Sequence, residues 1–362
     1  MIVLGRGRLD NRTNFWYNDY RDEAAVCYGM RDLITLLQSL EKLCIIIATE
    51  PDTPLNNADH VGSFNFMGKK MEKKTLPEPL NIKDQIANLK SIGLIIEDVG
   101  YASSMLDDIS YFRLVKAYSI GLKEKNGCYY KGVTFEQLVE LYLFNANFRQ
   151  LTFAQIEKIE VNLRSRLSNY FSTKYGVLGY LDSANFADQK YFEKFLQEIE
   201  REVNNNRRAP YIKNFQENYI DGQIPFYALV EVFSFGTLSK FLKNMKPEDK
   251  TALAKQYGIP YTFLESWIES LSYVRNVCAH YGRLYNAKLT KTPKLFKKYR
   301  EQNISSIRIF GILCCMKHLL PGDEHWKEYV DTLASLFEKY PHVDISTMGF
   351  PENWHEILLE NK

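Results

Sequence analysis

The sequence has few of the residues that mark stapled, fibrous or metal-dependent folds. Six cysteines in 362 residues show neither disulfide-framework nor zinc spacing, and the adjacent Cys314 and Cys315 lie in an apolar run, where buried thiols are expected. The histidines show no HExxH or Cys/His spacing, so we expect no metal and no cofactor. Twelve prolines and nineteen glycines exclude collagen-like and low-complexity architectures, and a hydrophobic content of 45% is typical of a globular chain.

Long hydrophobic runs are also missing. The longest apolar segments, residues 44–48 and 309–316, are much shorter than the roughly 18–20 residues that span a bilayer. The first fifteen residues contain three arginines but no apolar segment after them, so no signal peptide is predicted. We therefore expect a soluble, cytoplasmic protein with reduced cysteines and no membrane partner.

Helical patterns dominate the chain, and strand patterns are nearly absent. We predict an all-α fold with one short β-hairpin over residues 123–134, turning at Asn126 and Gly127. The expected regions are an N-terminal extension (1–76) with a helical pattern over 25–47 and a linker-like stretch over 51–74, a small helical lobe with the hairpin (77–134), and a helical domain (135–362). The predicted helices are 82–95, 101–109, 111–118, 135–150, 152–175, 188–205, 226–245 with an interruption near Gly236, 262–281, 304–320 and 324–340.

Charge is concentrated in one segment. The net charge of +2 predicts no polyanion binding by itself, but residues 281–300 carry seven basic residues and no acidic one. Cations mixed with aromatic rings suit an RNA backbone and its bases, although a basic run is more often only a solvated surface. If RNA lies here, bases would stack on Tyr285 or Tyr299. The predicted RNA-binding residues are Tyr285, Asn286, Lys288, Lys291, Lys294, Lys297, Lys298 and Arg300.

The segment 260–286 is predicted to be an amphipathic helix with chemistry on one face. Thr262 and Glu265 have the spacing of a capping box, and Gly282 is a natural C-terminal stop. An apolar stripe follows i, i+4, i+7, i+11 at Trp267, Leu271, Val274 and Cys278. If the helix persists through Gly282, a polar stripe opposite contains Asn276, His280 and Arg283, with Arg275 to one side and able to lean toward His280.

These residue types fit RNA cleavage by the 2′-hydroxyl without a metal ion. A histidine can take or give a proton near pH 7, an arginine can hold the phosphate and stabilise its charge, and an asparagine can orient either. A lone Arg–His pair carries little weight, because such spacings occur by chance and a histidine often caps a helix end.

The extended string is more specific. Residues 275–286, RNVCAHYGRLYN, resemble the RN-x-CAH-x-x-R-[LIV]-[WYF]-N signature of the Abi-like family, bacterial abortive-infection proteins of the AbiD/AbiF type within the HEPN superfamily. Residues 106–118, 156–164 and 231–241 resemble, in order, its L-x-x-I-x-YYRL-x-x-Y, IE-x-x-LR and E-x-x-SFG-x-LS segments. The resemblance covers about residues 77–320.

This resemblance implies a HEPN-like helical bundle in phage defence with metal-independent endoribonuclease activity. It implies catalytic roles for Arg275 and His280, with Asn276 as the polar residue that follows the arginine, and we add Arg283 to this candidate set. HEPN nucleases usually combine two copies of the motif, so one copy per chain implies a homodimer.

Structural interpretations and other functions stay open beside this one. Glu157, Glu160 and Arg164 are more simply an intrahelical ion-pair ladder than catalytic carboxylates, and residues 233–236 more simply a packed helix break. The nuclease can also be restrained by a partner RNA. The alternative is a catalytically silent HEPN protein that holds a structured non-coding RNA, and a third hypothesis is a protein-interaction scaffold.

Overall fold

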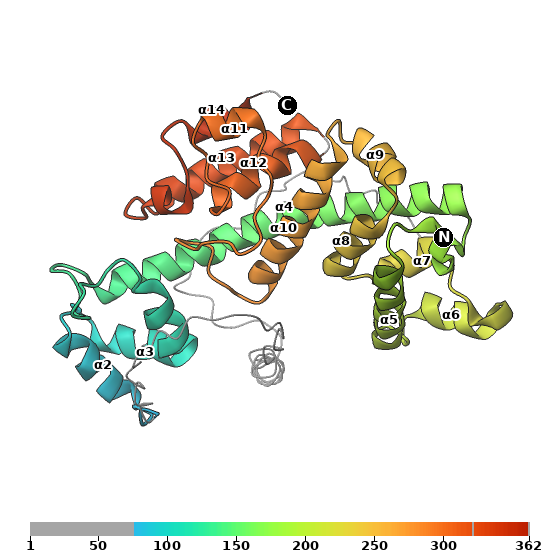
Figure 1. Ribbon diagram of the computed structural model, residues 1–362. Coiled ribbons are helices and arrows are strands. Elements are labelled where there is room, and N and C mark those ends of the chain that lie inside the picture. The colour runs from blue at the N-terminus through green and yellow to red at the C-terminus, as the bar shows by residue number, and fades with distance from the viewer. Residues whose placement is uncertain (1–75, 321, 361–362) are drawn as a thin grey trace, which may run out of the picture. The chain divides into compact units, whose positions relative to one another are not determined.

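The structure, a computed structural model, describes residues 76–320 and 322–360 (Figure 1). Internal contacts divide the chain into residues 1–76 and 77–362. The expected N-terminal extension, its helical pattern over 25–47 and its linker over 51–74 lie outside the described residues. Everything below concerns the second unit.

The described part is predominantly helical, which confirms the predicted fold class. Its β pairing is limited to three isolated bridges, and no helix in it has the length and hydropathy needed to cross a bilayer. The α-helices are α2 (Ile82–Ser91), α3 (Val99–Ile109), α4 (Phe135–Tyr175), α5 (Gln189–Asn205), α6 (Pro210–Asn218), α7 (Phe226–Leu229), α8 (Phe235–Asn244), α9 (Pro247–Lys255), α10 (Tyr261–Ala279), α11 (Lys297–Glu301), α12 (Ile309–Leu319), α13 (Asp323–Lys339) and α14 (Trp354–Leu359). The short turns are η1 (Phe112–Lys116, a π-helix) and the 3₁₀ segments η2 (Gly179–Leu181), η3 (Ser183–Asn185), η4 (Ile220–Gly222), η5 (Val230–Val232) and η6 (Ile345–Met348).

Helix α4 is the longest element, and α7, α10, α12 and α13 all pack on it (Figure 1). It begins at a capping box between Thr134 and Gln137 and ends at Gly176, whose φ is +79°. The predicted division into 135–150 and 152–175 is wrong. Thr152 lies buried inside one 41-residue helix, because no glycine or proline interrupts the pattern there and neighbouring helices cover it.

Helix α10 is held by α4, α8, α9 and α12. Its predicted apolar stripe is confirmed, since Trp267, Leu271 and Val274 are 0% exposed and Cys278 is 7% exposed. The Trp267 indole N–H donates to the Lys294 carbonyl at 2.6 Å, which satisfies the buried donor and ties the following loop to the helix.

The start of α10 differs from the prediction. The helix begins one residue earlier, with Pro260 at the N-cap and no side-chain cap, so the capping box between Thr262 and Glu265 does not form. The Glu265 carboxylate instead pairs with Lys250 of α9 at 3.0 Å. Tertiary packing against α9 takes the side chain that local capping would have used.

The break in the predicted helix 226–245 lies at Phe233 and Ser234, before Gly236. The segment divides into α7, η5 and α8, and the Ser234 hydroxyl caps α8 by accepting from the Thr237 N–H at 3.1 Å. Gly236 is an ordinary residue of α8. The structure therefore confirms a packed helix break within residues 233–236, but the break lies at Phe233 and Ser234 and not at Gly236.

The predicted hairpin is reduced to a chain reversal with one antiparallel bridge, Lys123 to Tyr129. The Gly127 N–H donates to the Glu124 carbonyl at 3.0 Å, so the central turn residues are Lys125 and Asn126. Gly127 follows the turn with φ +91°, the left-handed conformation that glycine adopts most easily.

Candidate functional site

The C-terminal end of α10 carries the central motif and closes in a Schellman arrangement. His280 is the C-cap, and its N–H donates to the Asn276 carbonyl at 2.9 Å. The Tyr281 N–H donates to the Cys278 carbonyl at 3.2 Å, and the Gly282 N–H donates to the Val277 carbonyl at 2.7 Å. The left-handed residue of this motif is Tyr281, with φ +58°, and not Gly282 as the sequence predicted.

Gly282 is needed for a different reason. A Cβ atom at this position would lie 2.8 Å from Val277 Cγ1 and 3.0 Å from the Val277 carbonyl oxygen. The chain therefore turns back against α10 where no side chain fits. Because the helix ends at Ala279, Arg283 lies in the following loop, and the predicted polar stripe holds only for Asn276 and His280.

Asn276 and His280 are both exposed, one turn apart at the end of α10. Tyr281 beside them is 51% exposed. A polar face with a histidine at its tip is thus open to a ligand, and the apolar stripe of the same helix is fully packed.

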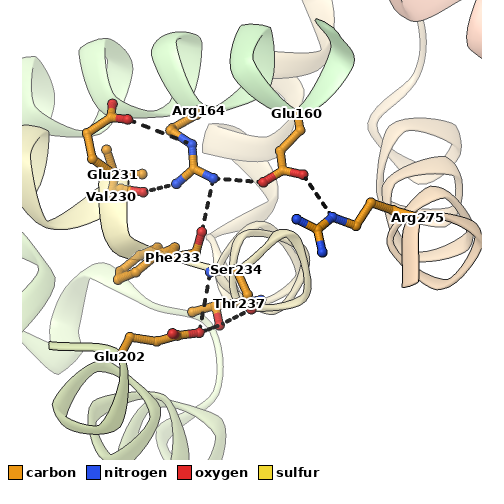
Figure 2. Close-up of polar contacts among 9 residues, drawn as sticks. All are labelled: Glu160, Arg164, Glu202, Val230, Glu231, Phe233, Ser234, Thr237 and Arg275. Carbon is orange, nitrogen blue, oxygen red and sulfur yellow. Dashed lines mark hydrogen bonds and ion pairs between the residues drawn. The ribbon is translucent and has the colours of Figure 1, made fainter. Parts of the chain in front are cut away.

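Arg275 is anchored by a carboxylate from α4. Its Nε lies 3.6 Å from Glu160 Oε2 (Figure 2). Its guanidinium also lies 5.6 Å from the centre of the Phe153 ring. The 3.6 Å separation is an ion pair that is too long for a hydrogen bond, and Nε has no hydrogen-bond partner among the described residues. The contacts of Arg275 are therefore with α4; its predicted lean toward His280 stays a prediction.

Glu160 also pairs with Arg164, one turn further along α4, at 2.8 Å, which confirms this pair of the predicted intrahelical ladder. Glu157, its third member, is exposed and lies within 4.0 Å of no described basic group. Arg164 in turn donates to the carbonyls of Val230 and Phe233, the latter at 2.9 Å (Figure 2). Three motif segments that are far apart in the sequence, 156–164, 231–241 and 275–286, thus meet around one carboxylate and one guanidinium. The helix pattern could not show that Glu160 reaches α10.

A second carboxylate fixes the same break from the other side. Glu202 of α5 accepts from the Thr237 hydroxyl at 2.9 Å and from the Ser234 N–H at 3.3 Å (Figure 2). Ser234 and Thr237 form the first turn of α8, which packs on α10. These contacts fix the start of α8 and thereby support α10, the helix that carries Arg275.

Two buried residues of α4 hold the loop after His280. The Arg149 guanidinium donates to the carbonyls of Tyr281 and Gly282 at 3.0 Å and 3.3 Å. Asn145 Oδ1 accepts from the N–H groups of Leu284 and Tyr285 at 2.8 Å and 2.9 Å. Sequence reasoning missed both; the only signal was a polar residue in otherwise apolar positions of a long helix.

The aromatic residues predicted to stack on RNA bases are buried, and this corrects the prediction. Tyr285 is 8% exposed and Tyr299 is 0% exposed. Tyr285 packs edge-on against Phe144 with ring centres 6.0 Å apart, and the Tyr299 hydroxyl shares a hydrogen bond of 2.9 Å with His318. Their rings complete the hydrophobic core, which leaves no face for a base.

The cations of the basic run are partly neutralised. Lys291 pairs with Glu269 at 2.9 Å, Lys297 with Glu301 at 3.5 Å, and Lys298 with Glu360 at 3.4 Å. Lys288, Lys294 and Arg300 are exposed, and no described acidic side chain lies within 4.0 Å of them. Asn286, with φ +47°, accepts from Arg308 at 3.2 Å. Roughly half of the run thus has the character of an ion-paired surface.

Three of the cysteines that the structure describes, Cys278, Cys314 and Cys315, are buried. Burial raises the pKa of Cys278 and of Cys314 to about 12, so both thiols are protonated at neutral pH. The expectation of buried thiols at Cys314 and Cys315 is confirmed. Within residues 76–320 and 322–360, no three side chains of His, Cys, Asp or Glu are grouped as metal ligands.

The comparison with protein families decides the relationship. The model of the family described as Abi-like protein matches residues 104–286, from α3 through the loop after α10. The chain belongs to the Abi-like family. Membership points to abortive infection, a form of bacterial defence against phage. No curated protein and no solved structure shows a significant match to the chain. The Abi-like match includes α4, the break before α8 and the whole of α10, which are the elements that meet in Figure 2.

Proposed function

We propose that this Abi-like protein is a metal-independent endoribonuclease of the HEPN type that acts in phage defence. One observation carries the proposal: α10 ends with Asn276 and His280 exposed, while Arg275 of the same helix is anchored by Glu160. A proton-transfer group and a phosphate-binding group thus come from the last turns of the same helix, which supports a shared site for RNA.

The chemistry follows from these two side chains. The 2′-hydroxyl of a ribose attacks the adjacent phosphorus, the bond from phosphorus to the 5′-oxygen breaks, and a 2′,3′-cyclic phosphate and a 5′-hydroxyl result. One proton leaves the 2′-oxygen and one joins the departing 5′-oxygen. His280 performs one transfer, and Arg275 stabilises the charge on the phosphate oxygens. Asn276 orients the phosphate or the imidazole.

A second proton-transfer group is supplied by a second copy of the chain. In-line displacement needs a base and an acid, and each chain has one His280 at this end of α10. Two-fold dimers are the commonest oligomers, and the exposed position of His280 suits a cleft between two copies. Light scattering should give twice the 42.3 kDa chain mass. A fully active monomer would contradict the dimer.

Toxicity of such an enzyme requires restraint, and we include a partner RNA in the proposal. The competing function is a silent protein that only holds a structured RNA. Both predict that RNA copurifies with the protein. They differ in the His280→Ala variant, since a silent holder has no cleavage to lose.

The deciding experiment compares RNA cleavage and growth on induction for the wild type, Arg275→Ala and His280→Ala. His325→Ala is the matched control, because His325 is an exposed histidine on α13. Cleavage and toxicity should vanish in the first two variants and persist in the control, with EDTA present throughout. Full activity of His280→Ala, or complete inhibition by EDTA, would contradict the proposal.

A further inference from the structure

Three arginines that have no acidic partner among the described residues lie around the loop after His280. Arg113 comes from η1, Arg149 from α4 and Arg283 from the loop itself. All three lie near the buried hydroxyl of Tyr118. Burial raises the pKa of this hydroxyl to about 12, and the three positive charges act in the opposite direction by lowering it. None of the three has a described acidic side chain within 4.0 Å. Clustered cations without counter-charge repel one another, and an anionic ligand would relieve this cost.

Arg113 is the accessible member. It is exposed, and its guanidinium lies 5.6 Å from the centre of the Tyr281 ring. Arg149 lies 5.7 Å from the same ring, but its NH1 donates to two carbonyls of the loop. A guanidinium stacked on an aromatic face keeps its N–H edge free for a phosphate. Arg113 thus presents donors directly beside the exposed end of α10.

Arg283 is half-buried and follows Tyr281 by two residues in the same loop. Burial lowers the pKa of Arg283, and the nearby positive charge of Arg308 lowers it further. Arg308 is committed to Asn286 and the Ala287 carbonyl at 3.2 Å and 3.1 Å. Arg283 therefore adds positive charge to this loop and has no described carboxylate within 4.0 Å to neutralise it.

The π-helical turn η1 also supplies an aromatic platform. Phe112 is 77% exposed, and Lys116, one turn later, is exposed as well. A phenylalanine so exposed beside cations has no role in the core, and π-helical turns often occur at functional sites. Cations combined with an open aromatic ring are the pattern that binds single-stranded nucleic acid.

We infer that Phe112, Arg113 and Lys116, together with Tyr281 and Arg283, form an RNA-binding surface for the nucleotides that flank the bond cleaved at His280. The inference rests on the proposed function, because it takes the ligand to be RNA. Arg113 and Lys116 contact backbone phosphates, Arg283 contributes to the local positive potential, and a base stacks on Phe112. The RNA then crosses from η1 to the end of α10, and not along the basic run 288–300.

The test measures binding of a 2′-O-methyl oligonucleotide, a single strand that cannot be cleaved by 2′-hydroxyl attack, as a function of salt. Variants are Arg113→Ala combined with Lys116→Ala, Arg113→Lys, and Phe112→Ala. Lys83→Ala is the control, since Lys83 is an exposed lysine on α2 of the same lobe. All four positions are on exposed surface, so thermal melting should match the wild type.

Removing two phosphate contacts should weaken binding about tenfold and flatten the slope of log affinity against log salt by about 1.4. Arg113→Lys keeps the charge and should keep the slope. Phe112→Ala should weaken binding about tenfold at an unchanged slope, because stacking releases no counterions. Lys83→Ala should change neither quantity.

The possible outcomes distinguish a failure of the proposed RNA-binding surface from a failure of the proposed nuclease function. If the wild type binds the probe and the double variant binds it with the same affinity and slope, the surface is wrong and the nuclease proposal stands. Unchanged binding with lost toxicity would assign η1 to a protein partner and overturn the inference equally. If the wild type neither binds nor cleaves RNA, both proposals fail.

Discussion

Two polar clusters of this protein are organised in opposite ways. Around Asp249, which is 0% exposed, three side chains of α4 converge: the Tyr170 and Tyr175 hydroxyls donate at 2.7 Å and 2.6 Å, and Lys174 forms an ion pair. Around the end of α10, by contrast, described arginines outnumber described acids, and Asn276 and His280 face outward. One cluster is neutralised internally and the other is left open.

The difference is the one expected between a structural cluster and the functional site that we propose. Buried charges that stabilise a fold are paired and hydrogen-bonded, as at Asp249, where α9 is fastened to the end of α4. A binding site keeps donors and cations unpaired until a ligand arrives. Glu160 and Arg149 lie between the two extremes, since Glu160 pairs with Arg275 and Arg149 holds the loop carbonyl of Tyr281, both within the proposed site.

The largest effect on stability should come from Asp249→Asn. Loss of the carboxylate weakens three charge-assisted hydrogen bonds and should lower the free energy of unfolding by about 3 kcal/mol. RNA cleavage per folded molecule should not change. Urea unfolding at pH 7 measures the free energy of unfolding. Equal stability of the variant and the wild type would show that the Asp249 cluster does not stabilise the fold.

The stabilisation by Asp249 should also depend on pH. Burial would raise the pKa of Asp249, but hydrogen bonds from Lys174, Tyr175 and Tyr170 outweigh it and hold the pKa below its ordinary value of 3.8. The contribution is therefore present above pH 3.8 and lost as the pH falls through the lower folded-state pKa. The stability gap between the wild type and Asp249→Asn should narrow in acid. A gap that widens below pH 4 contradicts this assignment.

Glu160→Gln should produce the next largest effect. The amide can still accept from Arg164, but it no longer attracts Arg275, so cleavage should fall about tenfold while the free energy of unfolding falls by about 1 kcal/mol. Glu157→Gln is the matched control, because Glu157 is exposed on the same helix. Equal turnover of the two variants would remove Glu160 from the account.

The basic run should contribute less to RNA binding than its charge suggests. Replacing Lys294, Lys297 and Lys298 with alanine would flatten the salt slope by about two units if all three bound phosphates. Since Lys297 and Lys298 pair with Glu301 and Glu360, and RNA is proposed to cross from η1 to the end of α10, we expect a change below about 0.7, the value for a single phosphate contact. A change of two units would mean that these ion pairs open when RNA binds.

The smallest effect on stability is expected for Tyr281→Gly. Glycine relieves the left-handed backbone, and the variant loses the ring between Arg113 and Arg149, so the two contributions oppose each other. The free energy of unfolding should change by less than about 1 kcal/mol, while binding of the 2′-O-methyl oligonucleotide weakens. A loss of several kcal/mol would show that Tyr281 is a core residue of the loop.

The local patterns were predictable from the sequence, and the long-range choices were not. The apolar stripe of α10 and the stop at Gly176 follow from periodicity and from glycine chemistry. The join of α4 at Thr152 and the uncapped start of α10 depend on neighbouring helices, which periodicity does not contain. Tertiary packing overrides local signals at both places.

The candidate site shows the same limit. Arg275, Asn276 and His280 could be named because they share one helix, and the structure keeps the last two exposed. Arg113 and Tyr281 meet only through the fold, 168 positions apart in the sequence. The prediction that Tyr285 and Tyr299 stack on bases was wrong, because composition does not distinguish an exposed ring from a buried one.

The central claim is that His280 and Arg275 cleave RNA through its own 2′-hydroxyl. The most direct measurement is the chemistry of the ends produced when purified protein cuts RNA in the presence of EDTA. We predict 2′,3′-cyclic phosphate and 5′-hydroxyl ends for the wild type and no product for His280→Ala. Ends bearing a 5′-phosphate, or wild-type product from the His280→Ala protein, would contradict the account.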